Sequence, residues 1–187
     1  MAAGKPLTPW FGHDRTLAQQ MMGLDRLFAQ VEGKTVLDVG CAEGLLSIEC
    51  AKSGAARVRG IEIRETAFDE ACRLRTKAGL SGRQCGFNCA DANTCDPGED
   101  YDIVLLLAVL HKLKNPTAAC ARLVAHAEDL VVIRLPPEHA PTIIDERSGN
   151  EPHHIGVVME RSGFVLEHQS YDGPFGEWVG YYRRVRA

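Results

Sequence analysis

The feature that most constrains the fold is an alternation of short apolar segments with segments of helical periodicity. Residues 101–107 are the clearest apolar segment, and they are hydrophobic on both faces. Strands of this kind belong to a sheet that is covered on two sides, and helical crossovers between such strands make the sheet parallel. We therefore predict an α/β fold, a three-layer αβα sandwich around a mostly parallel sheet.

The alternation begins with a helix that follows an arm containing Trp10 and Phe11. Its apolar face is marked by residues four and three positions apart: Leu17, Met21, Leu24, Phe28 and Val31. Strands are then predicted at 35–39, 56–63, 84–90, 101–107, 129–135, 164–170 and 177–185, and helices at 43–53, 65–78, 151–162 and after Asn115-Pro116. The order is a repeated strand–helix unit that closes on a pair of strands.

Size and composition are those of one globular domain. The chain has 187 residues, of which 45% are hydrophobic and 25% charged, and this excludes a disordered or fibrous protein. The net charge of −4 argues against wholesale electrostatic binding to nucleic acid but leaves a local basic patch open. Seven cysteines without a CxxC pair indicate free thiols in a reducing cytosol. Because the first residues contain no apolar signal segment, we expect a cytoplasmic protein that does not associate with membranes.

A glycine-rich turn after the first predicted strand is the strongest indication of a ligand site. Residues 38–44 read DVGCAEG. A strand, a glycine turn and a helix in succession let a ligand approach the backbone and meet the amide groups of a helix N-terminus. The dinucleotide fingerprint GxGxxG is not met, because Ala42 stands at its second glycine and Leu45 at its third. The pattern present is DxGxxxG.

Further motifs follow at the ends of the next predicted strands. Glu62 ends the second strand, eighteen residues after Gly44, where an acid can accept both hydroxyl groups of a ribose. Asp91 ends the third strand, and the fourth gives YDIV at 101–104 and VLHKL at 109–113. In this order the motifs resemble the class I S-adenosylmethionine (SAM)-dependent methyltransferases. In that family the acid at the position of Asp91 commonly meets the adenine amino group.

The resemblance covers residues 34–135 best and implies a seven-stranded sheet whose last strand is antiparallel. It also implies SAM as the cofactor and a division of the chain. Residues 1–32 would form an N-terminal arm and helix that cover the cofactor site, and residues 33–187 would form the methyltransferase domain. The connection at 136–150 is long for a loop and is a candidate lid.

The cofactor-binding residues that the resemblance implies are Asp38, Gly40, Cys41, Ala42, Gly44, Glu62, Ile63, Asp91, Ala92 and Leu107. Gly40 and Gly44 would let the methionine moiety lie against the backbone, and Asp38 would order the turn. Cys41 and Ala42 would contribute mainly backbone groups. Two alternatives stay open at this point: Asp38 only caps the turn, and Glu62 only pairs with Arg64.

His111 is the candidate catalytic residue. It lies just past the fourth predicted strand, and an imidazole with an ordinary pKa near 6.5 suits a general base. The alternative is that His111 orients a loop or contacts the sulfonium end of the cofactor. No metal site is expected, because the adjacent His153 and His154 would point about 100° apart on a helix and the cysteine spacings fit no zinc pattern.

The predicted function is transfer of a methyl group, by in-line displacement, to an oxygen or nitrogen nucleophile of a small molecule. A small acceptor is favoured because little chain remains outside the predicted core. An RNA methyltransferase is the alternative, since residues 109–116 faintly resemble a segment of wobble-uridine tRNA modifying enzymes. A non-catalytic SAM-binding interaction module is the third possibility. The oligomeric state is not indicated by the sequence.

Overall fold

A seven-stranded sheet forms the centre of the protein. The structure is a computed structural model, and it describes residues 15–137 and 152–186. The strands are β1 (Thr35–Val39), β2 (Arg57–Glu62), β3 (Cys85–Cys89), β4 (Tyr101–Leu107), β5 (Ala127–Leu135), β6 (Phe164–Ser170) and β7 (Trp178–Arg184). Their order in the sheet is β3-β2-β1-β4-β5-β7-β6. The first five strands pair in parallel, and β7 runs antiparallel to both of its neighbours, so the predicted sheet is confirmed.

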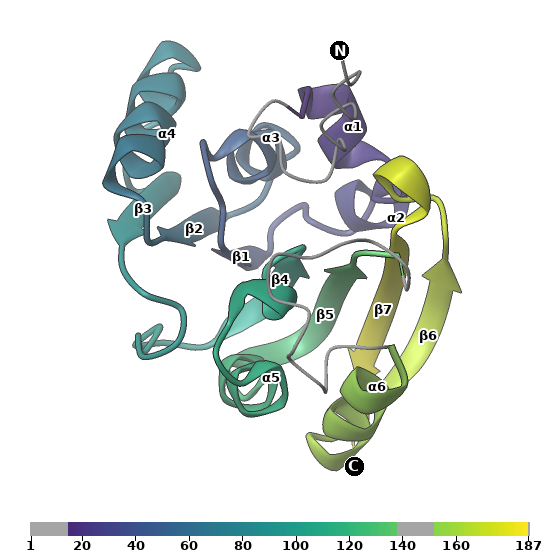
Figure 1. Ribbon diagram of the computed structural model, residues 1–187. Helices are drawn as coiled ribbons and strands as arrows, with labels where there is room; N and C mark the ends of the chain where they lie inside the picture. Colours follow the sequence, from purple (N-terminus) through teal and green to yellow (C-terminus); the bar gives the residue numbers. More distant parts are fainter. Residues whose placement is uncertain (1–14, 138–151, 187) are drawn as a thin grey trace, which may run out of the picture.

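Helices cover both faces of this sheet. They are α1 (Leu17–Met21), α2 (Asp25–Phe28), α3 (Leu45–Lys52), α4 (Glu65–Lys77), α5 (Pro116–Val124) and α6 (Pro152–Arg161), with the short 3₁₀ turns η2 (Leu110–Lys112) and η3 (Pro174–Gly176). Figure 1 shows α1 to α4 on one side of the sheet and α5 and α6 on the other. The predicted three-layer αβα sandwich is therefore confirmed.

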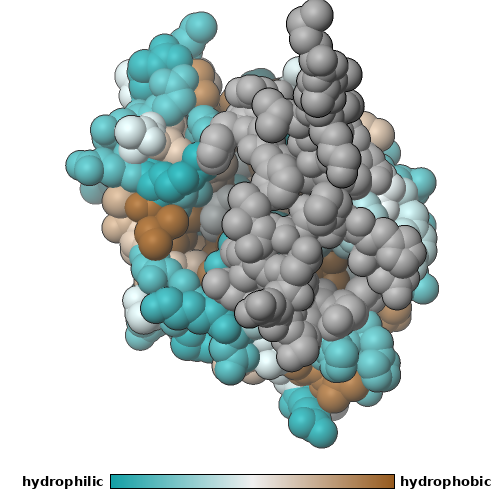
Figure 2. All heavy atoms as spheres, viewed as in Figure 1, coloured by the Kyte–Doolittle hydropathy of each residue, from teal (hydrophilic) through white to brown (hydrophobic). Residues whose placement is uncertain are grey.

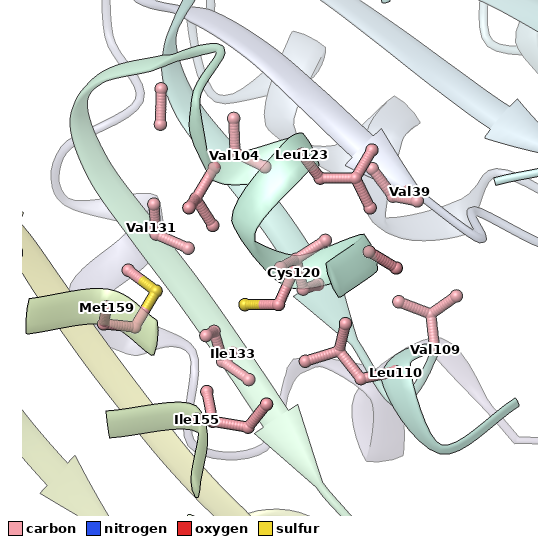
Figure 3. Close-up of a cluster of buried hydrophobic side chains, with 14 of the residues drawn as sticks. Val39, Val104, Val109, Leu110, Cys120, Leu123, Val131, Ile133, Ile155 and Met159 are labelled. Carbon is pink, nitrogen blue, oxygen red and sulfur yellow. The ribbon is translucent and has the colours of Figure 1, made fainter. Parts of the chain in front are cut away.

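Each interlayer space holds its own apolar core. On the α5 and α6 side, Cys120 and Leu123 of α5 and Met159 of α6 are fully buried against Val104 and Val131 of the sheet (Figure 3). The other core is built by the inward residues of α2, α3 and α4 on the opposite strand faces. Burial on both faces explains why β4 and β5 read as nearly continuous apolar runs.

The predicted first helix is wrong in one respect, because it is two short helices rather than one. The chain bends between α1 and α2 at Gly23, whose φ of +74° lies in the left-handed region. Its carbonyl oxygen accepts a hydrogen bond of 2.9 Å from Tyr181 Oη, and a Cβ there would lie 3.3 Å from Val179 Cγ2. Contact with β7, far along the sequence, therefore decides the bend.

Most other predicted boundaries hold to within two or three residues. α3 begins at Leu45 rather than at residue 43, because Gly44 before it has a φ of +73°. The Asn115 cap of α5 is confirmed, since its Oδ1 accepts from the Ala118 backbone N–H at 3.1 Å. The predicted arm and residues 138–150 of the candidate lid lie outside the described residues.

Candidate functional site

The reversal of strand order lies between β1 and β4. From β1 the chain builds outward through β2 to β3, and it then returns to the other side of β1 as β4. In open α/β sheets, ligands bind beyond the carboxyl ends of the strands at such a switch point. The turn after β1 and the segment after β4 meet there, because a Cβ on Gly40 would lie 2.7 Å from Val109 Cγ2.

The two glycines of the DxGxxxG turn are required by the chain's own packing. Gly40 and Gly44 have φ values of +74° and +73°, which favour glycine over other residues. A Cβ on Gly44 would lie 2.6 Å from Phe87 Cζ and 2.9 Å from Ala71 Cβ. Close packing of the turn against β3 and α4 therefore accounts for Gly44, and contact with Val109 accounts for Gly40.

Two alanines with left-handed backbone flank the switch point. Ala42 after β1 has a φ of +50° and Ala108 after β4 has a φ of +54°, and they are the non-glycine residues with positive φ in the described part of the chain. A non-glycine residue in this conformation costs about 1–2 kcal/mol. Such strained residues cluster at ligand and active sites, and here both lie at the same edge of the sheet.

The N-terminus of α3 opens toward this edge. Its first residue follows Gly44, which occupies the N-cap position and makes no side-chain cap to the amide groups of the first turn. Uncapped amides at a helix N-terminus are donors with a partial positive charge, and they bind anionic groups such as carboxylates. The residue types and backbone geometry after β1 can thus hold the carboxylate end of an amino-acid ligand.

Asp38 lies beneath the turn and is 3% exposed. Its Oδ2 accepts a hydrogen bond of 2.6 Å from Ser47 Oγ, which ties the end of β1 to α3. Burial raises the pKa of Asp38 to about 6, the Ser47 hydrogen bond opposes that rise, and the charge of Glu62 adds to it. The hydrogen bond therefore holds the end of β1, next to the turn, against α3.

Glu62 ends β2 and is 6% exposed. Its Oε2 accepts from the Ala42 backbone N–H at 3.0 Å, and its Oε1 accepts from the backbone N–H and the Nε of Arg64 at 2.9 and 3.1 Å. The expected pairing with Arg64 is therefore present, together with a contact that fixes the strained residue of the turn. A carboxylate has about four acceptor sites, so a further donor such as a ribose hydroxyl can still be accommodated.

The remaining predicted cofactor residues lie along the same edge. Asp91 follows β3 by two residues, and its Oδ1 accepts from the backbone N–H and the Nδ2 of Asn93, each at 2.8 Å. These hydrogen bonds lower its pKa, so the carboxylate is charged. Ile63 after β2 is 59% exposed, Ala92 is 7% exposed, and Leu107 at the end of β4 is half-buried.

His111 lies in η2, directly after β4. Its Nδ1 is buried and has no hydrogen-bond partner within the described residues. Burial, and then the positive charges of Lys112 and Arg15, lower the pKa of His111 to about 4. The imidazole is therefore neutral at physiological pH, and an unsatisfied buried nitrogen at a site edge is free to bond a ligand.

A buried ionic network near this edge was not predicted from the sequence. Arg134 near the end of β5 is 2% exposed, and Glu177 before β7 is 1% exposed. The Nε of Arg134 lies 3.7 Å from the Oε2 of Glu177. Arg15 forms two hydrogen bonds to Glu177, at 2.7 and 3.0 Å, and Arg134 Nη2 donates to the carbonyl oxygens of Gln20 and Met22. The network fastens the chain before α2 to the sheet. Its signal in the sequence was the single arginine inside the apolar run of β5.

Residues 15–137 and 152–186 contain neither a cluster of metal-ligating side chains nor a membrane-spanning helix. No group of three or more His, Cys, Asp or Glu side chains is placed to hold a metal ion. No helix among these residues has the length and apolar character needed to cross a membrane.

The chain resembles known methyltransferases in sequence over about half of its length. A family model described as "Methyltransferase domain" matches residues 36–129. The ubiquinone biosynthesis O-methyltransferase of Idiomarina loihiensis is 38% identical over 95 residues, which are 48% of this chain and 37% of that protein. The ribosomal protein L11 methyltransferase of Thiobacillus denitrificans is 39% identical over 97 residues, 50% of this chain and 28% of that protein. The chain thus spans less than half the length of these curated relatives.

The fold is shared over nearly the whole chain. The magnesium protoporphyrin IX methyltransferase of Synechocystis PCC 6803, solved with bound SAM, superposes with a TM-score of 0.74 at 21% identity, over 95% of this chain and 88% of that one. A SAM-dependent methyltransferase from Aquifex aeolicus gives a TM-score of 0.68 at 20% identity, over 92% and 95% of the two chains. With this shared fold and a family model that spans half of its residues, the chain belongs to the methyltransferase domain family.

Proposed function

We propose that this protein is a SAM-dependent methyltransferase that transfers a methyl group to an oxygen or nitrogen nucleophile of a small molecule. The observation that carries the proposal is the geometry of the switch point. There the turn after β1, with its strained Ala42 and the open N-terminus of α3, faces η2 after β4. The site combines donors for a carboxylate, acids for a ribose and an unsatisfied imidazole within one edge of the sheet.

The residues present fit the cofactor. The amides at the start of α3 would receive its carboxylate, with the backbone of Cys41 and Ala42 beside it. Glu62 would accept from the ribose hydroxyls, and Asp91 from the adenine amino group, with the exposed Ile63 against the adenine face. When bound, SAM supplies a methyl group on a sulfonium that is already activated for displacement.

The work left for the chain's own residues is mainly positioning. We propose that neutral His111 accepts a hydrogen bond at Nδ1 from the acceptor's hydroxyl or amine and takes its proton as the methyl group is transferred. With a pKa of about 4, His111 is a weak base that is not blocked by a proton at neutral pH. The strained Ala108 before η2 would fix the direction of this segment.

Several observations support a small acceptor and an intracellular setting. Ubiquinone biosynthesis O-methyltransferases are among the relatives that this chain matches. Within the described residues, the elements at the proposed site are short: η2 and the ends of β4 and β5. All seven cysteines are free thiols, which agrees with a reducing compartment such as the cytoplasm. An RNA acceptor stays the alternative to be tested.

Thermal unfolding with SAM, S-adenosylhomocysteine, NAD or no ligand tests the cofactor. A ligand at 100 times its dissociation constant should stabilise the fold by about 2.7 kcal/mol. We expect the first two ligands alone to raise the midpoint and Glu62→Ala to remove that rise. Glu49→Ala is the matched control, because Glu49 on α3 is bonded to exposed Lys52 rather than to the turn. A rise with NAD alone, or an undiminished rise in Glu62→Ala, would refute the assignment.

Transfer of labelled methyl groups then tests the acceptor. The enzyme would be incubated with labelled SAM and either an ultrafiltered metabolite extract or bulk RNA. Label in a small molecule is the expected result. Label in RNA alone would refute the small-molecule assignment, and label in neither, despite SAM binding, would favour a non-catalytic module.

A further inference from the structure

The last turns of α4, the α4–β3 turn and β3 form an edge whose own residues, 71–90, carry cations without acids. Residues 71–90 contain three arginines and one lysine but no Asp or Glu, in a chain whose net charge is −4. Figure 2 shows hydrophilic side chains over α4, which Figure 1 places at the end of the sheet. The local charge therefore opposes that of the whole molecule, and this edge attracts anions.

Two arginines from different elements converge on the α4–β3 turn at 81–84. The side chain of Arg59 on β2 extends over Gly86, its partner on β3. A Cβ added to Gly86 would lie 2.6 Å from Arg59 Nη1 and 2.8 Å from the carbonyl oxygen of Gly82, which belongs to the turn. Arg75 of α4 approaches from the other side, and a Cβ on Gly82 would be 3.5 Å from its Nη1. The exposed Arg83 lies in the turn itself.

Within the described residues, none of these three guanidinium groups forms a hydrogen bond or an ion pair with an acidic side chain; Arg59 acts on Glu99 only through its charge, since Glu99 is paired with Arg57. Arg59 Nη1 has only the Asn88 side-chain oxygen, at 3.5 Å, and Arg75 Nε is buried without a hydrogen-bond partner. Arg73 on the same helix differs, because it forms two hydrogen bonds to Glu70. The helix dipole favours cations at the end of α4, but it does not account for Arg59 on a strand or Arg83 in a turn.

The surface fits a chain of phosphates better than an acidic protein or a membrane. The planar arginine fork binds phosphate oxygens bidentately. Protein interfaces have an apolar centre, and membrane-surface segments insert apolar side chains. The large exposed apolar residues of the described chain are Met22, Ile63, Val165, Leu166, Tyr171 and Val185, and none is in residues 71–90.

We propose that Arg59, Arg75 and Arg83 form a docking surface for single-stranded RNA, which is held by its phosphates. The exposed Asn88 lies beside Arg59, and its amide can both donate to and accept from a ribose 2′-hydroxyl, a group that DNA lacks. The α4–β3 turn lies before β3, at the end of that strand opposite to Asp91, so docking at the turn does not require that the RNA be methylated.

Fluorescence anisotropy with a labelled oligouridylate tests the proposal. Three phosphate contacts give a fall in log K of about 2 per decade of salt concentration for a single strand. Arg59→Gln/Arg75→Gln should weaken binding at least tenfold and reduce that slope by about 1.4. The matched control is Arg26→Gln/Arg161→Gln, which removes equal charge from exposed positions on α2 and α6. Arg83→Glu, a change at an exposed turn residue, gives the same test if the double variant does not fold.

Each outcome bears on the proposal. Loss of binding in the arginine variants and retention in the control would support it. No RNA binding, equal loss in the control, or equal binding of oligodeoxythymidylate, polyglutamate or anionic phosphatidylserine vesicles would overturn it. The rise in unfolding temperature with SAM is read separately, so failure of RNA docking is distinguishable from failure of the proposed enzymatic function.

Discussion

Replacing Asp38 with asparagine should make the fold more stable at neutral pH and change how its stability depends on pH. Burial raises the pKa of Asp38 to about 6 from an ordinary value of 3.8. The folded state therefore holds this proton more tightly than the unfolded chain. The stability that this bound proton gives the folded state is fully present below about pH 4 and is lost as the pH rises through about 6. At 1.36 kcal/mol per pKa unit, the complete loss is about 3 kcal/mol.

Asparagine stays neutral at every pH, and its side-chain oxygen can still accept the hydrogen bond from Ser47. The free energy of unfolding of Asp38→Asn minus that of the wild type should therefore increase by about 2 kcal/mol between pH 4.5 and pH 7.5, where most of the Asp38 titration falls. Urea unfolding at both pH values, without SAM, measures this difference.

Asp69→Asn is the matched control, because Asp69 is an exposed aspartate on α4. Its stability should follow that of the wild type at both pH values. A constant difference between Asp38→Asn and the wild type would refute the reasoning, since it would mean that Asp38 carries no titration coupled to folding.

Three other predictions test the site and its support. Gly44→Ala should lower the free energy of unfolding in urea by about 2–4 kcal/mol, because the new Cβ meets the phenylalanine ring of β3. Gly79→Ala is the control: Gly79 has a similar φ of +75° but open space around it, so the loss should be only about 1–2 kcal/mol. His111→Gln should lower kcat about 100-fold or more in a methyl-transfer assay while SAM affinity in calorimetry stays within about threefold; equal losses would make it a cofactor contact. Glu177→Gln should lower stability by about 3–5 kcal/mol because Arg134 keeps a buried charge; an unchanged thermal midpoint would contradict this.

The order of elements and the place of the candidate site at the strand ends were predictable because their signals are local. Helical and strand periodicities, the glycines of the turn and the Asn115 cap each act over a few residues, and the structure agrees with them. The acid that ends β2 was predicted from its place after a strand, and Glu62 does lie at the switch-point edge. The strain at Ala42 was not predictable, because alanine gives no sequence signal of positive φ.

Contacts between distant segments were the part that the sequence did not reveal. The break between α1 and α2 at Gly23 depends on a contact with β7. The hydrogen bond from Ser47 to Asp38 depends on how α3 packs against β1. The convergence of Arg59 and Arg75 on one turn needs both sides of a sheet edge to be in place.

By itself, the sequence determined which segments become strands and helices and which motifs lie at the strand ends, because side-chain periodicity and glycine conformation act along the chain. Only the tertiary structure decided which charges are buried together. Arg15 and Glu177 are 162 residues apart, and they pair because the sheet brings the start of β7 beside the first helices. Burial and pKa depend on every group packed around a side chain, and those neighbours exist only once the layers have closed.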